Sequence, residues 1–270
     1  MVRRIRTINH RANAIAVGQS LMPLDRDGLL MRKCAGNYRR GLDMAVHPLL
    51  PQSVVQAAAA RRGRAHVYER FEAVKTALVV IDLQRAFMQP GAPSEVPQSR
   101  EIVPTVNRVA AALRVAGGTV AWVQASFDKK GWPNFFDHMV NPALSARILA
   151  ALQPGAELHG LWPELDVQPG DIVVPKYRLS AFLPGASPLP LMLRDRGVDT
   201  VLIAGCMTNV CCDSSARDAV MTDFRTVMIE DANAARTDEA HLATLTTFLQ
   251  AFGDVRGSAE MIAAFAIPGR

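Results

Sequence analysis

The sequence has 270 residues, of which 49% are hydrophobic, enough to bury one sizeable core or one core with an appendage. Its net charge of +5 comes from the first 70 residues, which carry 13 Lys and Arg against 4 Asp and Glu, whereas the remainder carries 17 against 21. No apolar run approaches the roughly 20 residues of a membrane span. No basic stripe of the remainder is interleaved with aromatic residues, so we expect neither a membrane nor a nucleic-acid partner.

The beginning of the chain differs from the rest. Residues 1–43 are basic and have no clear apolar periodicity and no signal-peptide core, so we interpret them as a loose arm or as the product of an upstream start codon, with Met44 as the true start. A basic, acid-poor start also resembles an organelle transit peptide. Residues 44–75 are a lead-in segment that the pattern does not place, and residues 76–270 are the main domain.

From Thr76 onward, buried apolar runs alternate with segments of helical spacing. In chain order, we predict a strand at 76–82, a helix at 102–115 and a strand at 119–124. A helix at 144–152, a strand at 171–176 and a helix at 190–196 follow. The last predicted elements are a strand at 200–205, a helix at 210–222, a strand at 225–231 and a helix at 238–252. This alternation is typical of βαβ units, which build a parallel sheet covered by helices on both faces.

Three candidate catalytic side chains follow predicted strands, where parallel sheets bind their ligands. Asp82 ends the first strand, Lys176 ends the third, and Cys211 follows the fourth in the segment GCMTNVCCDS. Taken singly, Asp82 fits a turn cap equally well, Lys176 fits a solvated edge residue, and Cys211 fits a buried structural cysteine. At the carboxyl ends of neighbouring strands, the three would supply a base, a supporting cation and a nucleophile.

The cysteines and the absent motifs narrow the chemistry. Cys211 lies near a predicted helix start, where the helix dipole favours a thiolate and free N–H groups can bind an oxyanion. With Cys34, Cys206 and Cys212 it forms no C-x-x-C pair, which argues against a disulfide framework or a zinc site and fits a reducing cytoplasm. The six histidines do not cluster at ligand spacing, and no nucleotide-binding glycine motif or G-x-S-x-G elbow is present. We therefore expect no metal and no cofactor.

Three sequence blocks carry a family resemblance. VVIDLQRAF, which contains Asp82, VVPKYRLSAF, which contains Lys176, and VDTVLIAGCMTNVCCDSSARDA, which contains Cys211, resemble the signature blocks of the isochorismatase-like cysteine hydrolases in content and order. The resemblance implies a Rossmann-like, three-layer α/β/α fold with a six-stranded parallel sheet. It also implies a cis peptide bond, carried over to Met207–Thr208, and an oxyanion hole formed by the backbone N–H groups of Thr208 and Cys211.

The activity that this resemblance implies is hydrolysis of a small-molecule amide or ureide. Cys211 would form a thioester with the substrate, and Asp82 would act as general acid and base. Lys176 would stabilise the carboxylate of Asp82 and the thiolate of Cys211. Isochorismatases proper cleave an ether without the cysteine, so a cysteine-independent ether hydrolase is one alternative, and a non-catalytic thiol sensor is another. Members with a metal carry a D-x-H-x-H motif after the second strand, where this sequence has ASFDK.

The details of the subfamily and the substrate pocket are further expectations. The doubled cysteine and the SAF run most resemble ureidoacrylate and streptothricin hydrolases, and family members often form homo-oligomers. Gln84, Phe87, Trp132 and Tyr177 are candidate substrate contacts, since they follow the candidate base and lysine or lie in a loop that could cover the site. Each of the four fits packing of the core or lid equally well.

Overall fold

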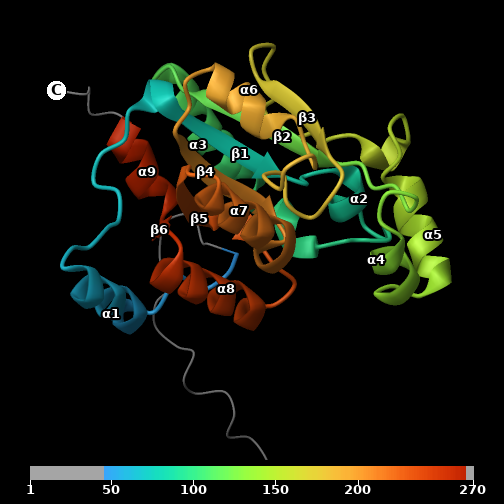
Figure 1. Ribbon diagram of the computed structural model, residues 1–270, viewed down its shortest axis with the longest axis horizontal. Coiled ribbons are helices and arrows are strands. Elements are labelled where there is room, and N and C mark those ends of the chain that lie inside the picture. Colours follow the sequence, from blue (N-terminus) through green and yellow to red (C-terminus); the bar gives the residue numbers. More distant parts are fainter. Residues whose placement is uncertain (1–45, 266–270) are drawn as a thin grey trace, which may run out of the picture. The chain divides into compact units, whose positions relative to one another are not determined.

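Six parallel strands form the centre of the computed structural model, which describes residues 46–265 (Figure 1). Their order across the sheet is β3-β2-β1-β4-β5-β6, and every neighbouring pair is parallel. The strands are β1 (Thr76–Ile81), β2 (Thr119–Ala125), β3 (Ile172–Lys176), β4 (Thr200–Cys206), β5 (Arg225–Ala234) and β6 (Asp254–Arg256). The predicted arm at residues 1–43 lies outside the described residues.

Helices cover both faces of the sheet, which confirms the expected three-layer α/β/α architecture. One face packs against α1 (Gln52–Arg62), α6 (Leu189–Asp195), α7 (Asp213–Met221) and α8 (Asp238–Ala251). The other face packs against α3 (Val103–Val115) and α9 (Ser258–Phe265). Because β1 and β4 are covered on both sides, all their residues are buried, as the continuous apolar runs predicted.

The remaining elements are short and connect the strands and longer helices. They are α2 (Arg85–Met88), α4 (Pro133–His138), α5 (Pro142–Ala151), the 3-10 helices η1 (Ala73–Lys75), η2 (Pro97–Arg100) and η3 (Glu157–His159), and the π-helical turn η4 (Thr208–Cys212). Of these, the sequence pattern predicted α5. It also predicted a helix at 210–222, where the structure has η4 followed by α7.

The described part of the lead-in segment packs onto the edge of the sheet at β6. Asp254 begins β6 with no exposed surface, and it accepts hydrogen bonds from the backbone N–H of Val67 at 3.0 Å and the guanidinium of Arg62 at 3.4 Å. His66 and Arg256 lie 3.6 and 3.2 Å from the same carboxylate. Residues 46–75 therefore attach to the main domain through a buried acid that the sequence did not single out.

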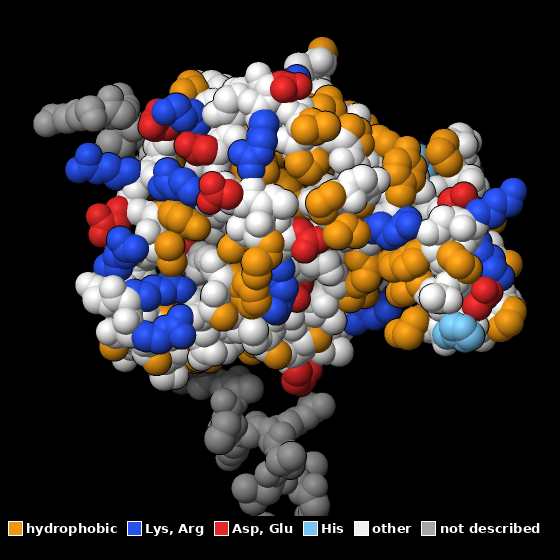
Figure 2. Space-filling view, viewed as in Figure 1, with side chains coloured by type: hydrophobic (Ala, Val, Ile, Leu, Met, Phe, Trp, Pro, Cys, Tyr) orange, Lys and Arg blue, Asp and Glu red, His pale blue; other side chains and the backbone are white. Residues whose placement is uncertain are grey.

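The opposite edge strand, β3, exposes apolar side chains. Val173 is 50% exposed, and Tyr177 and Leu183 in the loop that follows are each 43% exposed. Figure 2 shows apolar side chains gathered over this part of the molecule. The expected homo-oligomer stays a prediction. Among residues 46–265, no helix is long and apolar enough to cross a membrane.

Candidate active site

The candidate base lies where the strand order of the sheet reverses. The chain crosses from β1 to β2 on one side and β4 pairs on the other, so the carboxyl ends of β1 and β4 lie at the switch in strand order where α/β sheets usually bind ligands. Gly205 pairs with Ile81, and a side chain there would collide with the backbone of Ile81. Asp82 follows directly, with a φ of 55°, a left-handed conformation that aspartate tolerates better than most residues.

Lys176 reaches Asp82 from a strand that is not adjacent to β1. It ends β3, and β2 lies between β3 and β1, so the two strands are separated by roughly 10 Å. The residue of β2 that pairs with Lys176 is Ala125, whose small side chain leaves room at the end of β2. The sequence predicted neighbouring strands, whereas the structure has a long side chain that crosses the intervening strand.

The ammonium of Lys176 joins the three candidate catalytic residues. Its Nζ lies 3.0 Å from Asp82 Oδ2 and donates to Cys211 Sγ at 3.4 Å. The Asp82 contact is an ion pair without hydrogen-bond geometry. A third contact at 3.0 Å is a hydrogen bond to the carbonyl of Arg178, so the ammonium makes two hydrogen bonds and one ion pair. The ring of Phe127 lies 4.9 Å from Nζ and covers the group.

Burial and charge set the protonation of these groups. Burial raises the pKa of the Asp82 carboxyl, and Lys176 opposes the shift without cancelling it. Burial lowers the pKa of Lys176, but the neighbouring Asp82 and Cys211 outweigh that effect and leave it raised. Burial, followed by the charge of Asp82, raises the pKa of the Cys211 thiol. Cys211 is only 6% exposed, so its burial opposes the thiolate that the helix start was predicted to favour.

The turn that carries Cys211 is a π-helical turn between β4 and α7. The N–H groups of Val210 and Cys212 both donate to the carbonyl of Met207, at 3.0 and 3.1 Å. A cis peptide bond lies at Cys206–Met207, not at Met207–Thr208, so the family feature had been carried over one residue too far along the chain. Thr208 and Cys211 remain the expected donors of the oxyanion hole.

The three described cysteines differ in what their sulfur atoms contact. Cys211 Sγ faces Lys176, whereas Cys212 Sγ faces the carbonyl of Ala204 at 4.0 Å and Cys206 Sγ faces the carbonyl of Asp82 at 3.3 Å. Cys206 and Cys212 have no exposed surface, and burial raises the pKa of both thiols well above the usual value. Of the three, the geometry suits Cys211 for attack on a substrate.

The four candidate substrate contacts have different surroundings. Gln84 accepts a hydrogen bond from Ala125 N–H at 2.7 Å and donates to the carbonyls of Ala125 and His159, so its amide holds the backbone at the end of β2. Trp132 stacks on Phe135 with ring centroids 4.2 Å apart. The aromatic cluster around Trp132 also includes the buried Phe127 and Phe136, and the partly buried Phe87 packs against it. Tyr177 belongs to the exposed surface of the β3 edge, whereas the preceding Lys176 is fully buried.

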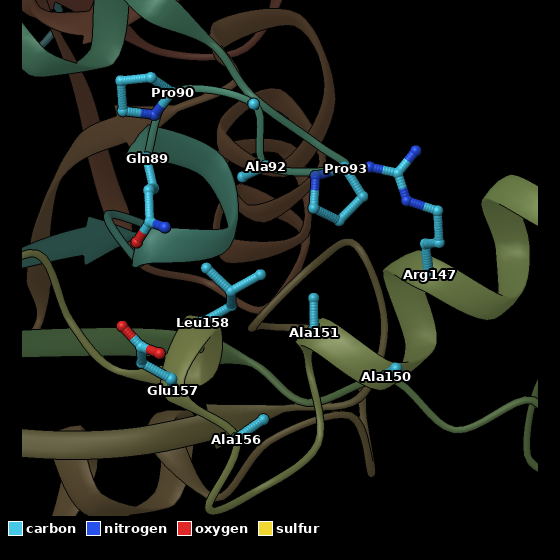
Figure 3. Close-up of a pocket in the computed structure, with 11 residues that line it drawn as sticks. Gln89, Pro90, Ala92, Pro93, Arg147, Ala150, Ala151, Ala156, Glu157 and Leu158 are labelled. Atoms are coloured by element: carbon cyan, nitrogen blue, oxygen red, sulfur yellow. The ribbon is translucent and has the colours of Figure 1, made fainter.

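A cavity of about 430 Å³ lies beside α5 (Figure 3). Its lining comes from the loop after α2, from α5 and from the segment around η3, with Arg147 and Glu157 as its charged members. Asp82, Lys176 and Cys211 are not part of this lining. We therefore do not assign the chemistry to this hollow.

Two histidine contacts near the site were not predicted. His159 Nε2 lies 2.8 Å from the hydroxyl of Ser126 at the end of β2, and His241 Nδ1 lies 2.9 Å from the hydroxyl of Thr208 in η4. The burial of His241 could have been predicted from the sequence, since it shares the apolar face of α8 with Leu245. Within the described residues, no group of three or more His, Cys, Asp or Glu side chains could hold a metal ion.

Comparison with known proteins identifies the family. The model of the Isochorismatase domain matches residues 76–260. The chain belongs to the isochorismatase family. Among solved structures of isochorismatase-like proteins, the chain is similar to a cysteine hydrolase from Pseudomonas syringae pv. phaseolicola, with 26% identity, a TM-score of 0.66, and coverage of 74% of this chain and 96% of that one.

Two further structures give the same result. An isochorismatase-like hydrolase from Alkaliphilus metalliredigens is 26% identical, with a TM-score of 0.59 over 72% of this chain and 97% of that one. The N-carbamoylsarcosine amidase from Thermoplasma acidophilum is 25% identical, with a TM-score of 0.57 over 72% of this chain and 99% of that one. The resemblance drawn from the three sequence blocks is thereby confirmed, and the protein is placed in a family of hydrolases.

Proposed function

We propose that this isochorismatase-family protein is a cysteine amidohydrolase that cleaves the carbonyl C–N bond of a small amide or ureide. The observation that carries the proposal is the position of Lys176 Nζ, 3.0 Å from Asp82 and 3.4 Å from Cys211 Sγ. A carboxylate, an ammonium and a thiol in contact at the carboxyl end of a parallel sheet supply a base, an electrostatic support and a nucleophile.

The first half-reaction acylates the enzyme. Asp82 accepts the proton of the Cys211 thiol, and the sulfur forms a bond with the substrate carbonyl carbon. The N–H groups of Thr208 and Cys211 hold the oxyanion, and Lys176 balances the negative charge that passes between carboxylate and sulfur. The C–N bond then breaks as Asp82 returns the proton to the leaving nitrogen, which departs as ammonia or an amine.

The second half-reaction releases the acid. Asp82, ionised again, takes a proton from water, and the resulting hydroxide attacks the thioester carbonyl. The C–S bond breaks, and the proton on Asp82 returns to the Cys211 sulfur. The raised pKa of Asp82 suits both steps, because a stronger carboxylate base shares a proton more evenly with a thiol or with water.

Two features favour an amide or ureide over an ether as substrate. The sulfur of Cys211 contacts the ammonium that also contacts the base, which an enzyme working without the cysteine would not need. One similar structure at 25% identity is an N-carbamoylsarcosine amidase, whose name implies cleavage of an amide-type C–N bond. A thiol sensor is less well supported, since Cys211 and Cys212 are both buried and sensor thiols are usually accessible.

The test is a screen of small primary amides, N-carbamoyl compounds and ureides for released ammonia or amine. The parent protein should release it from at least one compound after exhaustive EDTA treatment, and Cys211→Ala should not. Ammonia or amine release that survives in Cys211→Ala would contradict the proposed role of Cys211 as nucleophile. Turnover that disappears with EDTA and returns with zinc would contradict the metal-free mechanism.

A further inference from the structure

His47, a buried histidine that precedes the family domain, is linked by side-chain contacts to η4, the turn that carries the expected donors of the oxyanion hole. His47 precedes the matched residues 76–260 and is only 4% exposed. Its Nε2 accepts a hydrogen bond from Ala235 N–H at 3.0 Å, and its Nδ1 lies 2.7 Å from Asp238 Oδ1. Because an accepting Nε2 carries no proton, the proton of His47 is on Nδ1 and points at Asp238. Both ring nitrogens are thus fixed.

The ring of His47 in turn packs on a second buried ring. His47 and His241 are stacked, with centroids 4.4 Å apart and planes inclined by 23°. The Nδ1 of His241 lies 2.9 Å from the hydroxyl of Thr208, the first residue of η4. Burial, and then the neighbouring His47, lower the pKa of His241 to about 4, so the ring is neutral near pH 7. These contacts form a continuous path from the lead-in segment to the turn that carries Cys211.

We propose that His47 is a positioning residue for the oxyanion hole, because it holds His241 in the orientation that fixes Thr208. This inference rests on the proposed function, in which Thr208 N–H binds the oxyanion. Thr208 has no exposed surface, so its hydroxyl is oriented by the ring of His241 and not by bulk solvent. The lead-in segment, which lies before the family domain, would thereby contribute to catalysis without touching the substrate.

A positioning role predicts a specific kinetic effect. The oxyanion forms in the transition state, so a displaced Thr208 N–H weakens transition-state binding more than substrate binding. Removing an oxyanion donor outright costs about 100- to 1000-fold in kcat, and a misaimed donor should cost less, about 10- to 100-fold. Alkylation of Cys211 by iodoacetamide involves no oxyanion and should stay within about twofold of the parent rate.

The experiment uses the full chain and compares His47→Ala and His47→Phe with His66→Ala. His66 is a matched control, since it belongs to the same segment and pairs with Asp254 and Glu260 at 3.6 and 3.2 Å. We expect kcat on the best amide of the screen to fall about 10- to 100-fold in His47→Ala with KM little changed. His47→Phe, which retains an aromatic ring for stacking, should fall less. His66→Ala should keep its kcat, whatever stability it loses.

A kcat of His47→Ala as high as that of His66→Ala, or a rise in KM alone, would overturn the proposal. A parent with no activity toward any amide would instead overturn the proposed function. Hydrogen exchange then decides the positioning role, since His47→Ala should speed exchange of the η4 amides relative to both parent and His66→Ala. Unchanged η4 exchange would reject it. His47→Phe provides the same comparison if His47→Ala does not fold.

Discussion

At the scale of single residues, the candidate site combines a buried ion pair with a buried thiol whose pKa is raised by burial. Asp82 and Lys176 have no exposed surface and contact each other at 3.0 Å. Removing one partner of such a pair leaves an uncompensated charge, which costs about 3–5 kcal/mol. A purely structural site would gain little from retaining the pair beside a thiol. The arrangement is better explained by proton transfer between Cys211 and Asp82 next to a fixed cation.

The first prediction distinguishes the adjacent cysteines. Cys211→Ser should abolish turnover, and Cys212→Ser should retain most of it, because the Cys212 sulfur faces the carbonyl of Ala204 and not Lys176. Mass mapping after brief iodoacetamide treatment of the folded protein should find Cys211 labelled first. Faster labelling of Cys212, together with activity that survives the loss of Cys211, would reverse the assignment.

The second prediction concerns the base. Asp82→Asn should slow turnover by more than about 10³-fold, because in the proposed mechanism the carboxylate moves a proton in both half-reactions and each acid–base step contributes about 10²–10⁴. Asparagine tolerates the left-handed backbone at this position, where φ is 55°, so the substitution tests the charge and not the turn. Turnover is measured per folded molecule, with thermal stability determined on the same samples. Folded Asp82→Asn protein that works within a few-fold of the parent would leave Asp82 as a structural cap.

At the scale of elements, the site depends on how two strand ends and one turn meet. The sequence predicted the strands that end in Asp82 and Lys176, because long apolar runs followed by a polar residue are easily recognised. It did not predict that Lys176 crosses β2, since strand order is not visible in a periodic pattern. It also did not predict the π-helical start of the 210–222 helix, because side-chain spacing hardly differs between one π turn and one α turn.

The third prediction uses the contact between α8 and η4. The pKa of His241 is lowered from 6.5 to about 4, so in this range the unfolded chain binds a proton that the folded chain does not. The contribution of this residue to stability is therefore complete above pH 6.5 and is lost as the pH falls toward 4. The loss amounts to about 3 kcal/mol at most. Urea unfolding at pH 7 and pH 4.5 should show a smaller acid-dependent loss in His241→Leu than in the parent, and equal losses would contradict this explanation.

At the scale of the whole molecule, the apolar periodicity of the sequence predicted the elements in the middle of the chain best. It was least informative for β6 and for the lead-in segment. Five of the six strands were predicted from periodicity, whereas β6 has only three residues and too few side chains to show a period. In the lead-in segment, α1 buries only Ala58 and so has no apolar stripe to recognise. The ion pairs of Arg62 and His66 with Asp254 attach this segment to the domain, and charges far apart in sequence give no local signal of their pairing.

The fourth prediction concerns where the functional chain begins. A truncated chain that starts at Met44 should fold and keep its kcat, because it retains His47 and the residues that bind Asp254. A chain that starts at Pro51 should have a lower kcat than the chain from Met44, because it lacks His47. Solubility, thermal stability and kcat on the same substrate check both. An inactive or insoluble chain from Met44 would assign residues 1–43 a structural part.

The most direct measurement is the mass of the Cys211 peptide during turnover. The parent protein is mixed with an active amide of the screen, quenched in acid within one turnover and digested, and Cys211→Ala is treated in parallel. We predict that the peptide carrying Cys211 gains the mass of the substrate acyl group, that hydroxylamine removes this mass, and that the peptide of the variant gains none. Release of ammonia or amine at the parental rate by Cys211→Ala, with no acyl group on any cysteine of the parent, would contradict the account.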